Sequence, residues 1–227
     1  YNNTISDSIL RMAQFVEDTD FVGVPVLFSW ASGGKASLYV YDLNSMLAAR
    51  PQFAEASRLL TRTNATGFDV FAHSMGSMLT MDAIVQASKT GNFNKDGRLN
   101  NVMLASPDID LDLFESQLSQ LNADERNIFV FVSKDDAALG FARRIAGGVA
   151  RVGAADASEL EGLGVTVIDL SEIDDSTSGT HSKFAGSPEV VQLIGKGLEK
   201  DNFSTKQNQP TLIEILDGVP VVRRLIP

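Results

Sequence analysis

Residues 68–77 read FDVFAHSMGS. The run at residues 68–72 has the length and apolar composition of a buried β-strand, and residues 75–88 predict a helix directly after it. Ser74 therefore lies at a sharp turn between strand and helix, which is the setting of a nucleophile elbow. Ala72 and Gly76, two positions to either side, are small enough for such a turn. The pattern A-x-S-x-G departs only mildly from the usual G-x-S-x-G.

An elbow at this position would suit attack on a carbonyl group. Ligands of open α/β sheets bind at the carboxyl ends of the strands, where the Oγ of Ser74 would project. The backbone N–H of Met75 would lie at a helix N-terminus and could stabilise an oxyanion. A serine before a helix is also a common N-cap, but a cap alone does not call for Gly76.

The chain has only two histidines that could act as general base. His73 adjoins the elbow serine, and adjacent side chains at such a turn point in different directions. We interpret His73 as a packed, hydrogen-bonded residue beneath the turn. His181 lies between the last clear predicted strand, residues 165–170, and a predicted helix, residues 188–200. This order, serine before histidine, is that of α/β-hydrolases, so we predict His181 as the base, with an ordinary surface-loop histidine as the alternative.

The base needs a carboxylate that orients it, and three aspartates are candidates. Asp135 and Asp136 follow a predicted strand at residues 127–133, where turn-favouring aspartates are also common. Asp108 follows the preceding predicted strand, residues 101–105. The residues alone leave this choice open.

The rest of the chain fits one α/β domain. Its 227 residues are 44% hydrophobic and 21% charged, as in ordinary globular domains. Strand-like and helix-like segments alternate, which predicts a mostly parallel sheet flanked by helices. The tail from residue 201 gives no clear prediction. The further predicted elements are a strand buried on both faces at residues 22–30 and helices at residues 4–19, 38–62 with a break near Pro51, 111–121 and 137–152.

Composition excludes several other classes. The formal net charge of −10 argues against nucleic-acid binding through a basic surface, and the lack of cysteine excludes disulfides and thiolate metal sites. We find no apolar run of 18 residues, so no transmembrane helix is predicted. Asp108, Asp110 and Asp112 alternate, but Leu113 and Ser119 stand where an EF-hand needs glycine and glutamate. With two histidines and no cysteine we predict no zinc site, and no cofactor is implied. The sequence indicates no cellular location.

Motifs in order along nearly the whole chain resemble a group of bacterial α/β-hydrolases of unknown function in the esterase/lipase superfamily. The most specific are the elbow, residues 72–76, and the run DAAL at residues 136–139. In such proteins the catalytic acid begins that run, so the resemblance selects Asp136. The other matching pieces are Tyr1-Asn2-Asn3, Phe28-Ser29-Trp30, residues 105–110 (ASPDID), residues 133–139 and His181-Ser182.

The resemblance also implies a second oxyanion donor. Members of this group have a strand ending in His-Gly before a Tyr-Asn pair, and here the chain begins at Tyr1. The N–H of Tyr1 or Asn2 would then be the second donor. We expect a single α/β-hydrolase domain over residues 1–227 that lacks its N-terminal strands, with a missing N-terminal segment or a second chain completing the fold.

These observations predict a serine esterase acting on small-molecule esters. Ser74 would attack the acyl carbonyl, His181 would transfer the proton and Asp136 would hold the imidazole. Without a long insertion to form a lid, short acyl chains are favoured. Acyl transfer or amide cleavage by the same residues, and an inactive hydrolase-fold binding module, are the alternatives. Three apolar residues are candidates for an acyl pocket or for core packing: Trp30, Met75 and Met78.

Overall fold

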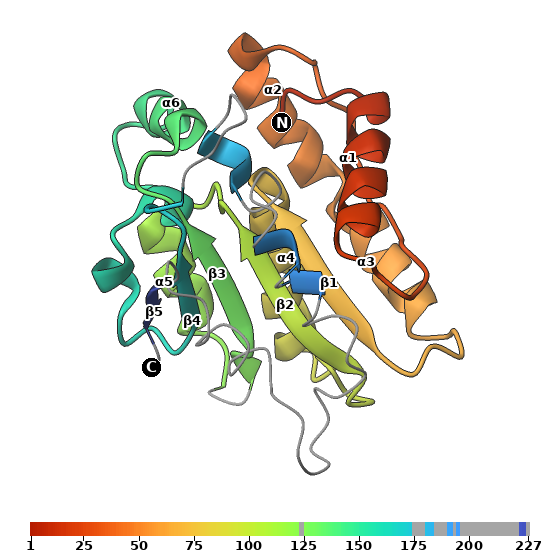
Figure 1. Cartoon of the computed structure of the whole chain (residues 1–227). Helices are drawn as coiled ribbons and strands as arrows, with labels where there is room; N and C mark the ends of the chain where they lie inside the picture. Colours follow the sequence, from red (N-terminus) through yellow and green to blue (C-terminus); the bar gives the residue numbers. More distant parts are fainter. Residues whose placement is uncertain (123–124, 174–179, 184–189, 193, 196–222, 226–227) are drawn as a thin grey trace.

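The computed structural model describes residues 1–122, 125–173, 180–183, 190–192, 194–195 and 223–225. Within them lies one five-stranded sheet with the strand order β1-β2-β3-β4-β5 (Figure 1). The first four strands are parallel and the fifth is antiparallel to β4, which confirms the predicted mostly parallel sheet. The strands are β1 (Phe68–His73), β2 (Leu99–Ala105), β3 (Ile128–Val132), β4 (Thr166–Asp169) and β5 (Arg223–Leu225).

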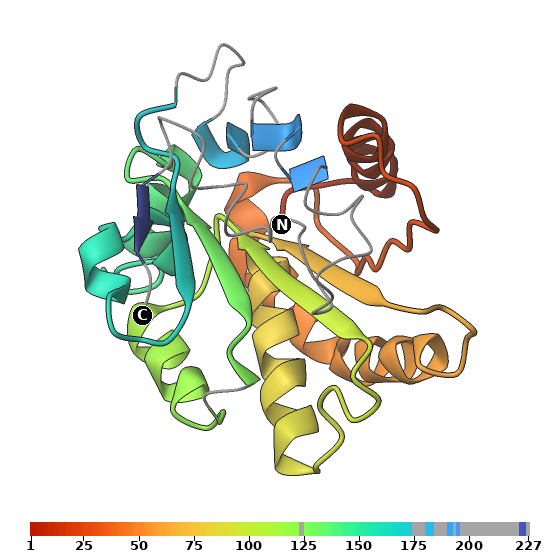
Figure 2. The same ribbon diagram turned by 60° about the horizontal axis from the view of Figure 1, so that its bottom comes forward.

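The helices lie close to the positions that the sequence predicts, and they pack on both faces of the sheet. α4 and α5 cover one face, and α1 lies toward the other (Figure 2). The α-helices are α1 (Ile5–Asp18), α2 (Tyr39–Ala48), α3 (Arg50–Leu60), α4 (Met75–Lys89), α5 (Leu111–Leu118) and α6 (Ala137–Ile145). Short 3₁₀ helices are η1 (Ala36–Leu38), η3 (Val152–Ala154), η4 (Ala157–Leu160) and η5 (Thr180–Ser182).

The central strands are buried on both faces, as their continuous apolar runs predict. Along β2, Val102 and Leu104 enter the core beneath α4 and α5, whereas Met103 and Ala105 enter the core on the opposite face. β3 alternates in the same way. The sheet therefore holds the carboxyl ends of β1 to β3 rigidly beside one another.

Local signals explain where the helices begin and end. Thr4 and Asp7 form a capping box that starts α1, and Pro51 lies in the first turn of α3, where its missing N–H costs nothing. Gly147 and Gly148 both have positive φ, so α6 ends at Ile145 rather than at the predicted residue 152.

The predicted doubly buried strand at residues 22–30 is wrong. This segment forms no strand, and Val22, Val24 and Val26 are 84%, 86% and 61% exposed. A strand needs a partner to satisfy its backbone groups, and among the described residues β1 pairs with β2 alone. An apolar run gives the propensity for a strand but does not show that a neighbour is present.

β5 lies in the tail from residue 201, which carries no clear sequence prediction. The helix predicted at residues 188–200 falls mostly outside the described residues. No helix in the described part of the chain has the length and apolar character needed to cross a membrane.

Candidate active site

Ser74 occupies the turn between β1 and α4 in a strained conformation. Its φ of 54° and ψ of −123° are unusual for a residue with a side chain. Two backbone hydrogen bonds tie it to the neighbouring strand and loop: its N–H donates to the carbonyl of Ala105 (2.9 Å), and its own carbonyl, which also accepts from Ser77 within α4, accepts from the N–H of Asp108 (3.2 Å). The end of β2 and the loop after it therefore fix the backbone of the predicted elbow.

The hydroxyl of Ser74 is buried without a partner. The residue is 3% exposed, and Oγ makes no hydrogen bond within the described part of the chain. Ser74 stands at the N-cap position of α4 but makes no side-chain capping bond, so the capping alternative has no support. A buried polar atom without a partner needs another explanation, such as a functional role.

His181 faces a carboxylate. Its Nδ1 lies 2.8 Å from Oδ2 of Asp136, a side chain that is fully buried. Because a carboxylate only accepts, Nδ1 carries the proton in this pair and Nε2 is left as the basic nitrogen when the ring is neutral. Asp136 also caps α6 by accepting from the N–H of Leu139 (3.0 Å), which fixes the carboxylate against the helix.

Asp135 pairs with Lys183 rather than with His181. Its Oδ1 accepts from Nζ of Lys183 (2.8 Å) and from Oγ of Ser133 (2.5 Å). Partial burial opposes ionisation, but these two hydrogen bonds lower the pKa of Asp135 below its usual range. Of the two neighbouring aspartates, only Asp136 contacts His181 in the described structure.

Asp108, the third candidate acid, does not pair with His181 among the described contacts. It accepts from the hydroxyl of Tyr39 (2.9 Å), and Nε of Arg151 lies 3.4 Å away. Burial raises the pKa of Asp108, and the charge of Arg151 opposes that shift. Asp108 contributes to the site through its backbone, which anchors Ser74.

The predicted oxyanion donors lie in different settings. Met75 is buried as the first residue of α4, at the end of the helix where N–H groups lack intrahelical partners. The N–H of Asn2 donates to Oδ2 of Asp42 (2.8 Å), so this amide is already engaged. The ring of Tyr1 packs edge-on against Tyr39 with centroids 5.0 Å apart.

His73 links the end of β1 to His181, the predicted base. Its Nε2 lies 3.2 Å from the backbone oxygen of His181, and the two ring centroids are 4.8 Å apart. His73 is thus packed and hydrogen-bonded, as its sequence context predicts. This contact places the segment that carries His181 next to the end of β1.

Comparison with known proteins identifies the fold family. A family model described as alpha/beta hydrolase of unknown function (DUF900) matches residues 1–197. The chain belongs to this family. Together with the four parallel strands and their flanking helices, the match confirms the predicted α/β-hydrolase fold and the resemblance to α/β-hydrolases of unknown function. No curated protein and no solved structure gave a match.

Two buried charged side chains near the site of this α/β-hydrolase, Asp42 and Lys183, are not indicated by any sequence pattern. Asp42 is fully buried and gathers the N–H of Asn2, the hydroxyl of Ser32 (2.6 Å) and the N–H of Gly33 (2.6 Å). Lys183 is buried beside Asp135. Their partners lie 9 to 48 positions away, so no local pattern could have indicated these roles.

The apolar residues near the elbow are part of the hydrolase core. Met75 belongs to a cluster with Tyr39, Met46 and Leu79, and Trp30 packs against it. Met78 also packs there. These contacts show that the three candidate pocket residues are part of the core packing.

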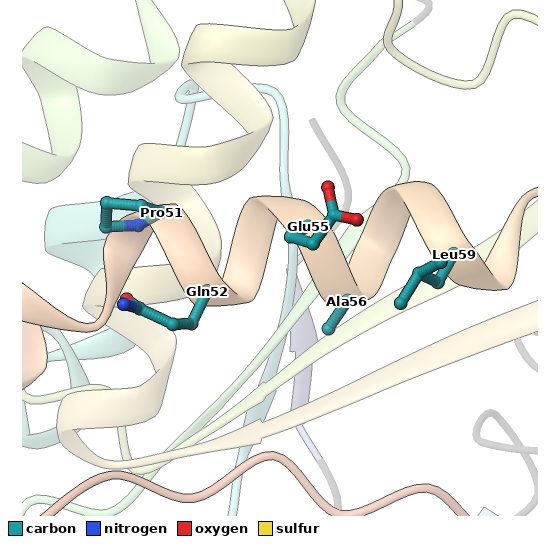
Figure 3. Close-up of a pocket in the computed structure, with 5 residues that line it drawn as sticks. All are labelled: Pro51, Gln52, Glu55, Ala56 and Leu59. Atoms are coloured by element: carbon teal, nitrogen blue, oxygen red, sulfur yellow. The ribbon is translucent and has the colours of Figure 1, made fainter.

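A separate shallow hollow lies on α3 (Figure 3). None of the predicted catalytic or oxyanion residues lines it. Its lining residues are Pro51, Gln52, Glu55, Ala56 and Leu59.

Proposed function

We propose that this α/β-hydrolase is a serine hydrolase that cleaves small-molecule carboxylic esters. The observation that carries the proposal is the strained, buried Ser74, whose hydroxyl has no partner in the described structure. A stability role would need a satisfied hydroxyl and a relaxed backbone, and Ser74 has neither. The family supports hydrolysis in general, and the serine mechanism and the ester substrate are our proposal.

Ser74 acts as nucleophile and His181 as base in the proposed reaction. His181 takes the Oγ proton through Nε2 while Oγ forms a bond to the acyl carbon. The imidazolium then gives that proton to the departing alcohol, leaving an acyl-enzyme. Water, deprotonated by the same nitrogen, attacks the acyl carbon, and Oγ of Ser74 recovers the proton as the acid leaves.

Asp136 holds the imidazole in the required tautomer. Its Oδ2 accepts from Nδ1 at 2.8 Å and stabilises the positive charge that His181 gains. The α6 cap prevents the carboxylate from turning away, because Oδ1 is bonded to the N–H of Leu139. The hydrogen bond between Ser74 and His181 would form when substrate binds, since catalytic hydrogen bonds are often long or absent without it.

The oxyanion is assigned to two backbone donors. The N–H of Met75 lies at the positive end of α4, where developing negative charge is stabilised. The second donor is the backbone nitrogen of Tyr1, because the N–H of Asn2 is bonded to Asp42. Asp42 would hold this part of the chain in place.

A fluorophosphonate probe tests the proposal directly. We expect labelling of Ser74, identified by mass spectrometry of the labelled peptide, and its loss in Ser74→Ala and His181→Ala. Ser77→Ala is the matched control, because Ser77 is a buried serine one turn into the same helix and its hydroxyl is bonded to the carbonyl of Ala72. A panel of esters graded by acyl length would then test the preference for short chains.

Two outcomes would redirect the assignment. Labelling of Ser74 without ester turnover would favour acyl transfer or amide cleavage, which product analysis separates. No labelling of Ser74 under any condition would contradict the serine mechanism and favour an inactive binding module.

A further inference from the structure

His73 makes a contact that the proposed reaction does not use. It is the last residue of β1, directly before Ser74, and its Nε2 lies 3.2 Å from the backbone oxygen of His181. A carbonyl oxygen only accepts hydrogen bonds, so Nε2 must be the donor and carry the hydrogen. The backbone of the predicted base is therefore bonded to the strand that carries the predicted nucleophile.

We propose that His73 is a positioning residue that holds the imidazole of His181 between Asp136 and Ser74. This inference rests on the proposed roles of those three residues. His73 does not exchange protons with substrate. Its Nε2–H fixes the main chain of His181, so that the ring can pivot little about its bond to Asp136.

The segment that carries His181, residues 180–183, needs such an anchor because its only regular structure is one short turn. His181 lies in η5, a single 3₁₀ turn, outside the sheet. Among the described contacts, Lys183 ties the segment to Asp135, and Arg11 donates to the hydroxyl of Ser182 (3.2 Å) at the surface. Both act on residues after His181.

The bond from His73 differs from these because it reaches His181 itself. It also starts from β1, whose register against β2 is continuous from Asp69 to His73. A rigid strand thus supplies the donor, whereas the other two anchors use long, flexible side chains. Effective catalysis needs reacting groups held in a narrow range of geometries, which such a short connection provides.

The charge state of His73 fits this role. Burial lowers its pKa well below the usual value, and nearby His181 adds to the shift. His73 is therefore neutral at pH 7, with the hydrogen on Nε2. A neutral donor holds the carbonyl without placing a second positive charge beside the imidazolium that forms on His181.

Histidine-selective NMR tests the proposal on the full chain. The sequence contains two histidines, so ¹⁵N-histidine labelling gives two imidazoles, assigned with the His73→Phe variant. We expect His73 as the neutral Nε2–H tautomer. In His73→Phe the Nδ1–H signal of His181 should shift or broaden, and in His73→Gln it should return toward its wild-type position, since the glutamine amide nitrogen can take the place of Nε2.

The rate of Ser74 labelling by a fluorophosphonate gives the second readout. We expect His73→Phe to label about five- to tenfold more slowly, the loss of one hydrogen bond, with His73→Gln recovering most of the rate. Arg11→Ala, which removes the exposed anchor on Ser182, should label at nearly the wild-type rate. Thermal unfolding of each variant identifies any loss of folded protein.

The two readouts separate this inference from the proposed function. An Nδ1–H tautomer of His73, or a His181 signal and a labelling rate unchanged in His73→Phe, would overturn the positioning role. If wild-type Ser74 does not label, the serine mechanism fails. The tautomer of His73 and the response of the His181 signal still decide whether His73 holds His181.

Discussion

Oδ2 of Asp136 lies 2.8 Å from Nδ1 of His181, although 45 positions separate them in the chain. The preceding residue, Asp135, pairs at the same distance with Lys183. Two successive carboxylates therefore hold the first and third residues of one segment. Asp136 contacts the imidazole ring that would transfer protons, whereas Asp135 contacts Lys183 and so holds only the segment on which that ring lies.

Asp136→Asn and Asp135→Asn should differ sharply in activity. Asparagine at 136 can still cap α6, but its amide favours the wrong tautomer of His181, so ester turnover should fall by about 10³–10⁴-fold. Asp135→Asn weakens a contact to Lys183 in which the aspartate side chain is 52% exposed, so turnover should stay within about tenfold. Ester hydrolysis and thermal unfolding of both variants check this. A larger loss in Asp135→Asn would mean that the acid is misassigned.

Ser74→Gly should be more stable than Ser74→Ala. Alanine keeps a Cβ at a φ of 54°, which costs about 1–3 kcal/mol of backbone strain. Glycine adopts this backbone without strain. Its larger loss of conformational entropy on folding offsets only part of that advantage. We expect the free energy of unfolding to be about 1 kcal/mol higher for glycine, measured by urea denaturation.

Ser77 provides the matched control for that comparison. It lies within α4, and its hydroxyl bond to Ala72 is lost in both variants. In a helix alanine is favoured over glycine by about 1 kcal/mol, so the order should reverse. The same order at positions 74 and 77 would show that the elbow is not strained.

The strained turn at Ser74 and the candidate base His181 could be singled out from the sequence because their signals are local or scarce. Strand, serine and helix follow one another within residues 68–88, and His181 is one of two histidines. The choice between Asp135 and Asp136 could not be predicted from the residues alone. Tertiary packing determines that one carboxylate faces Lys183 and the other faces His181. The residues left it open, and the resemblance to α/β-hydrolases favoured the aspartate that contacts His181.

Features that depend on distant neighbours could not be predicted. The amide of Asn2 was a candidate oxyanion donor until the structure placed Asp42, 40 residues later, within 2.8 Å of it. Residues 22–30 have the apolar run of a strand, but their exposure depends on which segments lie beside them. Propensity is a local quantity, whereas sheet membership requires a partner.

Gly153→Ala should destabilise the protein markedly. A Cβ at this position would lie 2.5 Å from the carbonyl carbon of Ser106 and 2.6 Å from the nitrogen of Pro107, backbone atoms that cannot turn aside. Overpacking of this kind costs about 1–3 kcal/mol, and the displaced loop precedes Asp108, which anchors Ser74. We expect a lower midpoint of urea denaturation and slower labelling of Ser74.

Gly140→Ala is the control for Gly153→Ala. Gly140 lies within α6, and beyond the nearby backbone of that helix a Cβ there would meet no atom of the described residues within 4 Å. Because alanine favours a helix, this variant should be about 0.5–1 kcal/mol more stable than wild type. Equal effects at positions 140 and 153 would contradict the close packing of η3 against the loop after β2.

Stability should fall as the pH is lowered from about 6.5, and His73 should cause much of this fall. An unfolded histidine binds a proton below a pKa of about 6.5, but burial lowers the pKa of His73 well below that value in the folded protein. Between these two values the unfolded state binds more protons, so acidification favours unfolding by up to about 1.4 kcal/mol per pH unit. Above pH 6.5 both states are neutral at this residue, and its contribution no longer changes.

His73→Gln should remove the part of this pH dependence that His73 causes, because glutamine does not titrate. Urea denaturation of both proteins at pH 7.5, 6.5 and 5.5 measures the difference in slope. Asp42 and Asp135, whose pKa values are lowered from 3.8, titrate below this range and do not contribute to it. If wild type and His73→Gln lose stability equally on acidification, His73 is not held neutral in the folded protein, and its ring must be able to take up a proton next to His181.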